Sequence, residues 1–155
     1  MANMASMAMM GEAWEAWATA EQACAARAAT TAALGRLQRA QVAEARRIRQ
    51  VVAWYYNFTA AQLTQRGRRR ELAEARQVAM YLMRTDLRWP TRAGNERFPL
   101  ERIGRLLARD HSTVLHGVAV IDARAASEGT MRATLGAIRA ELERLEDEED
   151  EEGGR

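Results

Sequence analysis

Residues 100–119 read LERIGRLLARDHSTVLHGVA, and this stretch decides the predicted fold. Ile103 and Leu107 lie one helical turn apart, and Val114 and Val118 repeat that spacing. Two apolar helix faces joined by so short a connection are typical of a helix-turn-helix motif. We therefore expect two short helices that meet through these faces.

Two small residues suit the same motif. Gly104 is small where two helices must approach closely, and Ala108 stands where the turn between such helices often has glycine. The stretch therefore predicts close packing at Gly104 and a tight turn at Ala108.

The second helix of this motif begins with polar side chains. In a helix-turn-helix, the residues at the start of the second helix meet base edges in the major groove of DNA. The residues at these positions here are Arg109, Asp110, His111, Ser112 and Thr113. They are the candidate DNA-contacting residues of the motif.

Simpler roles remain open for several of these side chains. Asp110 is a natural N-cap, and Ser112 or Thr113 could satisfy backbone groups of the first turn. We expect His116 to face inward, against the first helix. A catalytic set of Asp110, His111 and Ser112 is disfavoured because neighbours on one helical turn diverge, whereas a proton relay needs them to converge. The sequence therefore predicts no enzyme.

The segments before the motif are also helical in pattern. We expect residues 1–11, rich in Met and Ala, to be a disordered lead, and residues 12–47 to form one long Ala-rich helix that runs on to about Gln50. Trp14 and Trp17 lie on one face of that helix. They either fold back on the domain or pair with another chain, so residues 12–47 are a candidate for self-association or for binding a protein partner.

From Ile48 the apolar pattern becomes dense enough for a core. An apolar cluster fills residues 48–63, with its aromatic residues in the core or at its rim, and a second helix is predicted for residues 72–84. Both prolines fall in the connection from residue 84 to Pro99. Because no segment alternates with period two, we predict an all-α helical bundle without strands, over residues 48–145.

Charge is strongly segregated along the chain. Residues 36–109 hold 17 arginines against six acids, whereas residues 146–152 are all acidic. A central segment this basic suits a polyanion such as nucleic acid. The alternative, that arginine merely replaces lysine on solvated helix faces, accounts for the choice of arginine but not for its clustering. Runs of like charge repel themselves, so we expect a disordered acidic tail over residues 146–155.

The composition excludes several classes of protein. All 23 basic residues are arginine, so a Schiff-base lysine and a lysine-containing phosphate loop are absent. One cysteine and two histidines make no credible zinc site, and we expect no metal and no cofactor. No stretch has the roughly 18 apolar residues of a membrane span. We expect a cytoplasmic protein.

Three blocks together resemble a known family. RDHSTVLH at residues 109–116, RQVAMYL at 76–82 and VAWYY at 52–56 are similar, in the same order, to the C-terminal DNA-binding domain of the bacterial replication initiator DnaA. The resemblance covers residues 48–145. It does not reach the ATPase domain of that family, which we expect to be missing.

The resemblance implies a function and a set of contacts. It implies recognition of short duplex sites, the DnaA boxes, with the helix-turn-helix in the major groove and a basic loop in the minor groove. Arg68 matches the minor-groove arginine, and Arg76 and Gln77 match residues that contact the DNA backbone or bases. The neighbouring candidates in the basic loop are Arg66, Arg69 and Arg70.

This sequence also departs from the family pattern. The connection between residue 84 and Pro99 is longer than expected, and its arginines, Arg88, Arg92 and Arg97, could add phosphate contacts. We expect a role in replication initiation or its regulation. The alternative is a protein-interaction module or transcription regulator that works through the long helix, with DNA affinity secondary.

Overall fold

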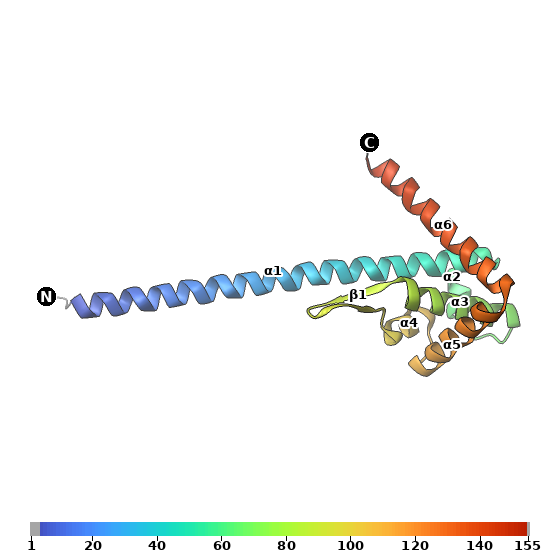
Figure 1. Ribbon diagram of the computed structural model, residues 1–155, viewed down its shortest axis with the longest axis horizontal. Coiled ribbons are helices and arrows are strands. Elements are labelled where there is room, and N and C mark those ends of the chain that lie inside the picture. The colour runs from blue at the N-terminus through green and yellow to red at the C-terminus, as the bar shows by residue number, and fades with distance from the viewer. Residues whose placement is uncertain (1–3, 155) are drawn as a thin grey trace. The chain divides into compact units, whose positions relative to one another are not determined.

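The computed structural model describes residues 4–154, with side chains from Met7 onward, and is mostly helical, as predicted (Figure 1). The chain divides into two units, Met1–Gln38 and Arg39–Arg155, which are described separately. The elements in chain order are α1 (Met4–Tyr55), α2 (Ala60–Thr64), α3 (Arg70–Asp86), β1 (Arg88–Thr91), β2 (Gly94–Arg97), α4 (Leu100–Leu107), α5 (His111–Ser127) and α6 (Gly129–Gly153).

The helix α1 is longer at both ends than the sequence predicts. It begins at Met4, so the expectation that residues 1–11 are a disordered lead is wrong for residues 4–11 and lies outside the described residues for 1–3. Alanine and methionine are good helix formers and no proline interrupts them. At its other end α1 runs on to Tyr55, and its last turns enter the core.

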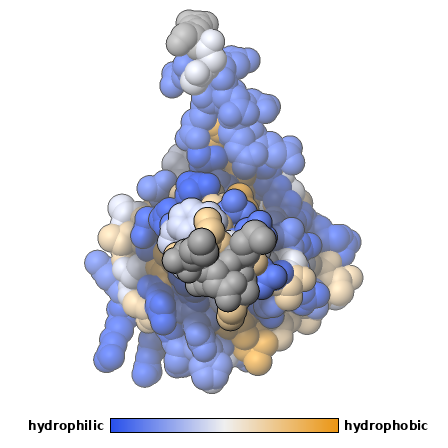
Figure 2. Space-filling view, turned by 90° about the vertical axis from the view of Figure 1, so that its left-hand side faces the viewer, coloured by the Kyte–Doolittle hydropathy of each residue, from blue (hydrophilic) through white to orange (hydrophobic). Residues whose placement is uncertain are grey.

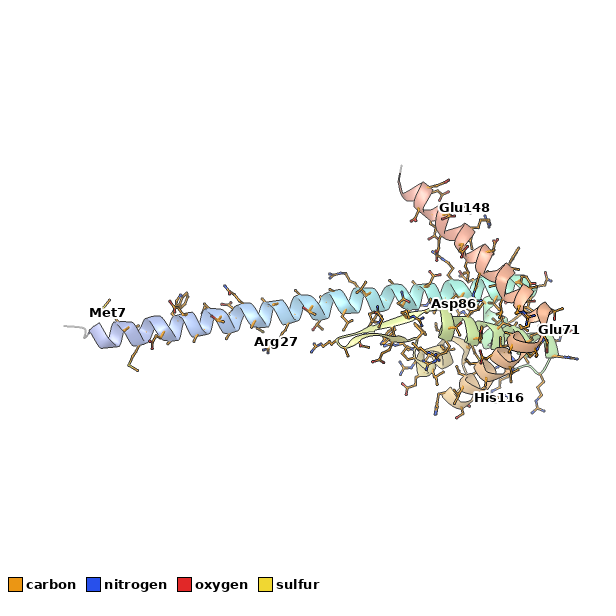
Figure 3. The ribbon with its side chains drawn as sticks, in the orientation of Figure 1. Met7, Arg27, Glu71, Asp86, His116 and Glu148 are labelled. Carbon is orange, nitrogen blue, oxygen red and sulfur yellow. The ribbon has the colours of Figure 1, made fainter. Side chains whose placement is uncertain are left out.

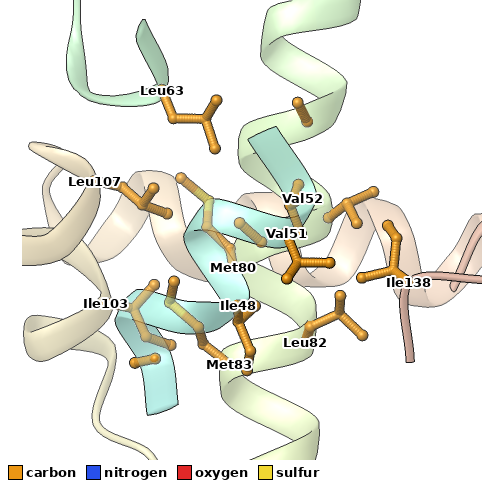
Figure 4. Close-up of a cluster of buried hydrophobic side chains, with 14 of the residues drawn as sticks. Ile48, Val51, Val52, Leu63, Met80, Leu82, Met83, Ile103, Leu107 and Ile138 are labelled. Atoms are coloured by element: carbon orange, nitrogen blue, oxygen red, sulfur yellow. The ribbon is translucent and has the colours of Figure 1, made fainter. Parts of the chain in front are cut away.

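The core lies in the second unit and is made by all the longer helices. Ile48 and Val52 of α1, Met80 and Met83 of α3, and Ile138 of α6 are among its buried side chains (Figure 4). Met80 and Met83 are thus core residues. The cluster around residues 48–63 is less complete than predicted, because side chains at its end face solvent. The exposed ones are Trp54 and Tyr55.

The prediction of a fold without strands is wrong at one place. β1 and β2 form a two-stranded antiparallel hairpin, with Arg88 opposite Arg97. A single aromatic contact anchors it: the buried Trp89 ring meets the Phe98 ring edge-on, with centroids 5.6 Å apart. Four-residue strands, one containing Pro90, are too short to show an alternating pattern.

The acidic end of the chain is helical, contrary to the expected disordered tail. α6 extends to Gly153, and of the acidic tail only Arg155 lies outside the described residues. Arg144 pairs with Glu141, at 2.7 Å, and with Glu148, one turn to either side. Glu149 pairs with Arg47 of α1. These contacts offset part of the repulsion between neighbouring carboxylates.

Candidate nucleic-acid interface

The predicted helix-turn-helix is formed by α4, a tight turn and α5. Ile103, Leu107 and Val114 are fully buried and Val118 is half-buried, so the two apolar faces meet as expected. The turn begins at Ala108, whose φ of 51° is in the left-handed region. This backbone conformation explains why glycine is common at the position.

Gly104 is needed for close approach, but the partner differs from the expected one. A Cβ at Gly104 would lie 2.4 Å from the carbonyl oxygen of Arg109, so the turn itself packs on this glycine. The close approach of two helices occurs instead at Gly117 of α5. There an added Cβ would lie 2.7 Å from the Sδ of Met80 in α3.

The first turn of α5 presents polar side chains to solvent. His111, Ser112 and Thr113 are all exposed. Asp110 is the N-cap, and one of its carboxylate oxygens accepts a hydrogen bond from the backbone N–H of Thr113 at 2.8 Å. This hydrogen bond stabilises the charged carboxylate and so lowers the pKa of Asp110.

The expectation that His116 faces inward is wrong. His116 is exposed on the outer side of α5, as Figure 3 shows, because Val114, Gly117 and Ile121 take the inward positions of the helix. Leu115 is also exposed, by 56%. Sequence reasoning missed both residues, although spacings of four from His111 and Ser112 place them on the same outward face.

The loop between α2 and α3 carries a concentration of positive charge. Its arginines are exposed, and in the described part of the chain they form no ion pair, whereas the paired arginines lie on other elements. The exposed arginines of this basic loop are Arg66, Arg68, Arg69 and, at the first position of α3, Arg70. The unpaired charge suits an anionic ligand.

Arg76 lies beneath the basic loop. It is only 5% exposed, and its guanidinium donates hydrogen bonds to the carbonyl oxygens of Leu63 and Gly67, both at 2.8 Å. It also donates to the carbonyl oxygens of Gln62, at 3.4 Å, and Gln65. Burial, reinforced by the positive charge of Arg109, lowers its pKa. The guanidinium therefore holds the loop in place from below.

Arg109 joins the same loop to the helix-turn-helix. Its guanidinium donates to the carbonyl oxygen of Gln65 at 2.8 Å and to that of Ala108 at 2.7 Å. The Gln65 carbonyl thus accepts from both Arg76 and Arg109. These shared hydrogen bonds bring the basic loop next to the start of α5.

Gln77 occupies the crossing of α3 and α5. It is half-buried, and its Cγ lies 3.3 Å from the position a Cβ would take at Gly117. Its Cα lies 3.7 Å from the same point. The structure therefore places Gln77 against the middle of α5, away from the first turn of that helix.

The described residues show neither a metal site nor a membrane helix. Over residues 4–154, no group of three or more metal-ligating side chains comes together. None of the helices in that range is apolar enough over its length to cross a bilayer.

These features define a helix-turn-helix protein with a basic loop beside its second helix. Residues 45–121 match the family model described as the bacterial dnaA protein helix-turn-helix. They form a DnaA C-terminal helix-turn-helix DNA-binding domain.

Individual relatives agree with this family. The chain is 40% identical over 92 residues to the chromosomal replication initiator protein DnaA of Thermomicrobium roseum. This alignment covers 59% of this chain and 18% of the relative. It is 34% identical over 105 residues to the same protein of Deinococcus radiodurans, covering 66% of this chain and 20% of the relative. The chain spans about a fifth of the length of the curated relatives it matches, and the match leaves out their ATPase region.

A solved structure shows the same fold. It is described as a DNA replication initiation factor and superposes with a TM-score of 0.55 at 24% identity. The superposition covers 70% of this chain and 31% of the other.

Proposed function

We propose that the protein binds duplex DNA at sites like the DnaA box and acts in replication initiation or in its regulation. The first turn of α5 enters the major groove, where Thr113 contacts a thymine methyl group and His111 donates to a base or phosphate. Arg68 enters the neighbouring minor groove from the basic loop. The protein works in the cytoplasm, where bacterial DNA is found.

One observation carries this proposal. Arg109 donates to the Gln65 carbonyl, which ties the basic loop to the start of the second helix of the motif. The exposed side chains of both segments can then meet one duplex together. Exposed polar residues on one segment alone would support only general affinity for phosphates.

A binding titration tests the proposal against a DnaA-box duplex and a scrambled duplex. His111→Ala and Thr113→Ala should each cost about 1 to 3 kcal/mol on the box duplex and little on the scrambled one, because contacts to bases carry sequence information. Arg66→Ala should weaken both duplexes about equally, as loss of a phosphate contact does.

Thr130→Ala is the matched control for Thr113→Ala. It removes the same side chain from the exposed start of α6 and should leave both affinities unchanged. If His111→Ala and Thr113→Ala weaken both duplexes equally, the specific part of the proposal is wrong. If the wild-type protein binds neither duplex at moderate salt, the proposal as a whole is wrong.

A second candidate function rests on α1. Trp14 and Trp17 are 65% and 54% exposed, and their ring centroids lie 5.0 Å apart. A pair of large exposed rings is typical of a surface that another protein covers. We propose, as the alternative, that residues 12–47 self-associate or bind a protein partner, as in an interaction module or a transcription regulator.

Sedimentation of the full chain tests this alternative. Joint replacement of Trp14 and Trp17 by alanine should shift a self-associated protein toward monomer. Trp54→Ala is the control, because Trp54 is equally exposed, by 66%, but lies outside this segment. An unchanged sedimentation coefficient, with wild-type protein already monomeric, would count against self-association.

A further inference from the structure

A small cavity between α1 and α4 is lined by arginines and apolar side chains. It has a volume of about 270 Å³ and lies wholly in the unit of residues 39–155. Its apolar lining is Val42 of α1 and Leu106 of α4. The polar part of the lining consists of three arginines, Arg46, Arg102 and Arg105.

The charge of this arginine cavity is unbalanced. Its lining includes no acidic residue, and in the described part of the chain the guanidinium groups of its three arginines form neither ion pairs nor hydrogen bonds with protein groups. Two other cavities of the protein each combine arginine with acids, such as Arg47 with Glu149, or Arg139 with Asp86. The arginine cavity therefore lacks the counter-charge that the others contain.

The walls of the cavity are held in position. Arg102 lies with its guanidinium carbon 4.1 Å above the centre of the Trp89 ring, a cation–π contact. Arg49 of α1 donates a 2.7 Å hydrogen bond to the carbonyl oxygen of Leu106, which joins the α1 wall to the α4 wall. Arg102 and the two helix walls are thus in place before any ligand arrives, which lowers the entropy lost on binding.

Much of the protein surface is polar, as the face in Figure 2 shows, so exposure of single arginines is ordinary. Solvation does not explain why three arginines line one cavity that contains no acidic residue. Arginine presents a planar fork of N–H donors that matches phosphate oxygens. The cavity is also slightly smaller than the roughly 300 to 1,000 Å³ typical of sites for drug-sized molecules.

We propose that the arginine cavity formed by Arg46, Arg102 and Arg105 is a binding site for one phosphate group. The phosphate belongs either to the backbone of a bound nucleic acid or to a free phosphate or phosphomonoester. The site does not depend on the function proposed above, because inorganic phosphate alone can probe it.

The first experiment titrates inorganic phosphate into isotope-labelled full-length protein and follows the arginine Nε–H resonances by NMR. At constant ionic strength, the resonances of Arg46, Arg102 and Arg105 should move as phosphate is added and reach a plateau when the site is saturated. Arg46→Gln and Arg105→Gln should each weaken phosphate binding about tenfold, because each removes charge-assisted hydrogen bonds. Both positions are exposed on helices and glutamine is a good helix former, so the fold is retained.

Arg27→Gln is the control for these variants. It removes the same charge from an exposed position on α1 outside the cavity and should leave phosphate binding unchanged. The proposal is wrong if the cavity resonances do not shift, or if Arg27→Gln weakens binding as much as Arg46→Gln does.

The second experiment identifies the source of the phosphate. It compares a duplex limited to the box with one that has flanking base pairs on both sides. Log affinity falls linearly with log salt concentration. If the cavity holds a DNA phosphate, Arg105→Gln should make this slope shallower by about 0.9 on the longer duplex, whether or not it does so on the shorter one. An unchanged slope, together with weakened binding of inorganic phosphate, assigns the site to a free phosphate or phosphomonoester.

The two proposals fail separately. Wild-type protein that binds phosphate in the cavity but prefers no duplex would overturn the DNA-binding proposal alone. Protein that distinguishes box from scrambled DNA, but whose cavity variants behave as wild type in both experiments, would overturn the phosphate site alone.

Discussion

Gly104→Ala should lower the free energy of unfolding by about 3 kcal/mol, at the upper end of the cost of overpacking a tight site. The new Cβ would lie 2.4 Å from the carbonyl oxygen of Arg109 and 3.5 Å from its carbonyl carbon. Both obstacles are backbone atoms, so no side chain can turn away to make room. The whole turn between α4 and α5 must move, and Arg109 moves with it.

Urea unfolding measures this loss, and Gly136→Ala is its control. Gly136 is exposed within α6 and has no heavy atom within 4 Å of the position of an added Cβ. Alanine there should stabilise the protein by up to about 1 kcal/mol, because alanine is the better helix former. If Gly104→Ala were as stable as wild type, the turn would not pack on Gly104 as the structure shows.

Arg76→Ala should have a comparable effect, lowering the free energy of unfolding by about 2 to 4 kcal/mol. The change removes the guanidinium donor from the carbonyl oxygens of Leu63 and Gly67 and leaves the Gln65 carbonyl with Arg109 as its remaining guanidinium donor. It should also weaken the binding of box DNA, because the basic loop loses the hydrogen bonds that hold it beside α5. Arg76→Lys should not restore either property, since an ammonium group cannot supply the planar set of donors.

Arg70→Ala is the matched control, because Arg70 begins the same helix but is exposed and forms no ion pair in the described structure. It should change stability by no more than about 0.5 kcal/mol. The two roles of Arg76 are distinguishable by urea unfolding combined with DNA titration. Lost DNA binding with unchanged stability would show that Arg76 contacts DNA directly and does not position the loop.

The helix-turn-helix could be predicted because its pattern is local. The inward positions Ile103, Leu107 and Val114 follow from helical spacing, and all three are buried. The tight turn at Ala108 follows from its place in the motif, where glycine is common, and its φ of 51° fits that position. His116 was assigned inward although its spacing of four from Ser112 places it on the outward face, and packing of α5 on α3 at Gly117 leaves it exposed.

The hairpin and the helical tail could not be predicted because tertiary contacts create them. Trp89 anchors β1 only because Phe98 comes to lie beside it. The tail is helical where Arg144 and Arg47 neutralise its carboxylates, and Arg47 is about one hundred residues away in the sequence.

The arrangement of the candidate interface could be predicted only in part. The residue types are visible in the sequence, and the contacts of Arg109, Asp110, His111, Ser112 and Thr113 with DNA remain predictions. The depth of Arg76 is not visible, because buried and exposed arginines have the same local pattern. The link between loop and helix is not visible either, because it passes through a main-chain carbonyl of Gln65.

That carbonyl has a consequence for the kind of double helix the protein accepts. With Arg76 and Arg109 bonded to the same oxygen, the spacing between the cationic loop and the tip of α5 is fixed before any ligand is met. In the proposed binding mode, only a duplex whose neighbouring grooves have that spacing can contact the basic loop and α5 at the same time. A-form RNA, with its deep and narrow major groove, does not. An RNA duplex of the same sequence as the DnaA box should therefore bind weakly, because its grooves have the wrong shape.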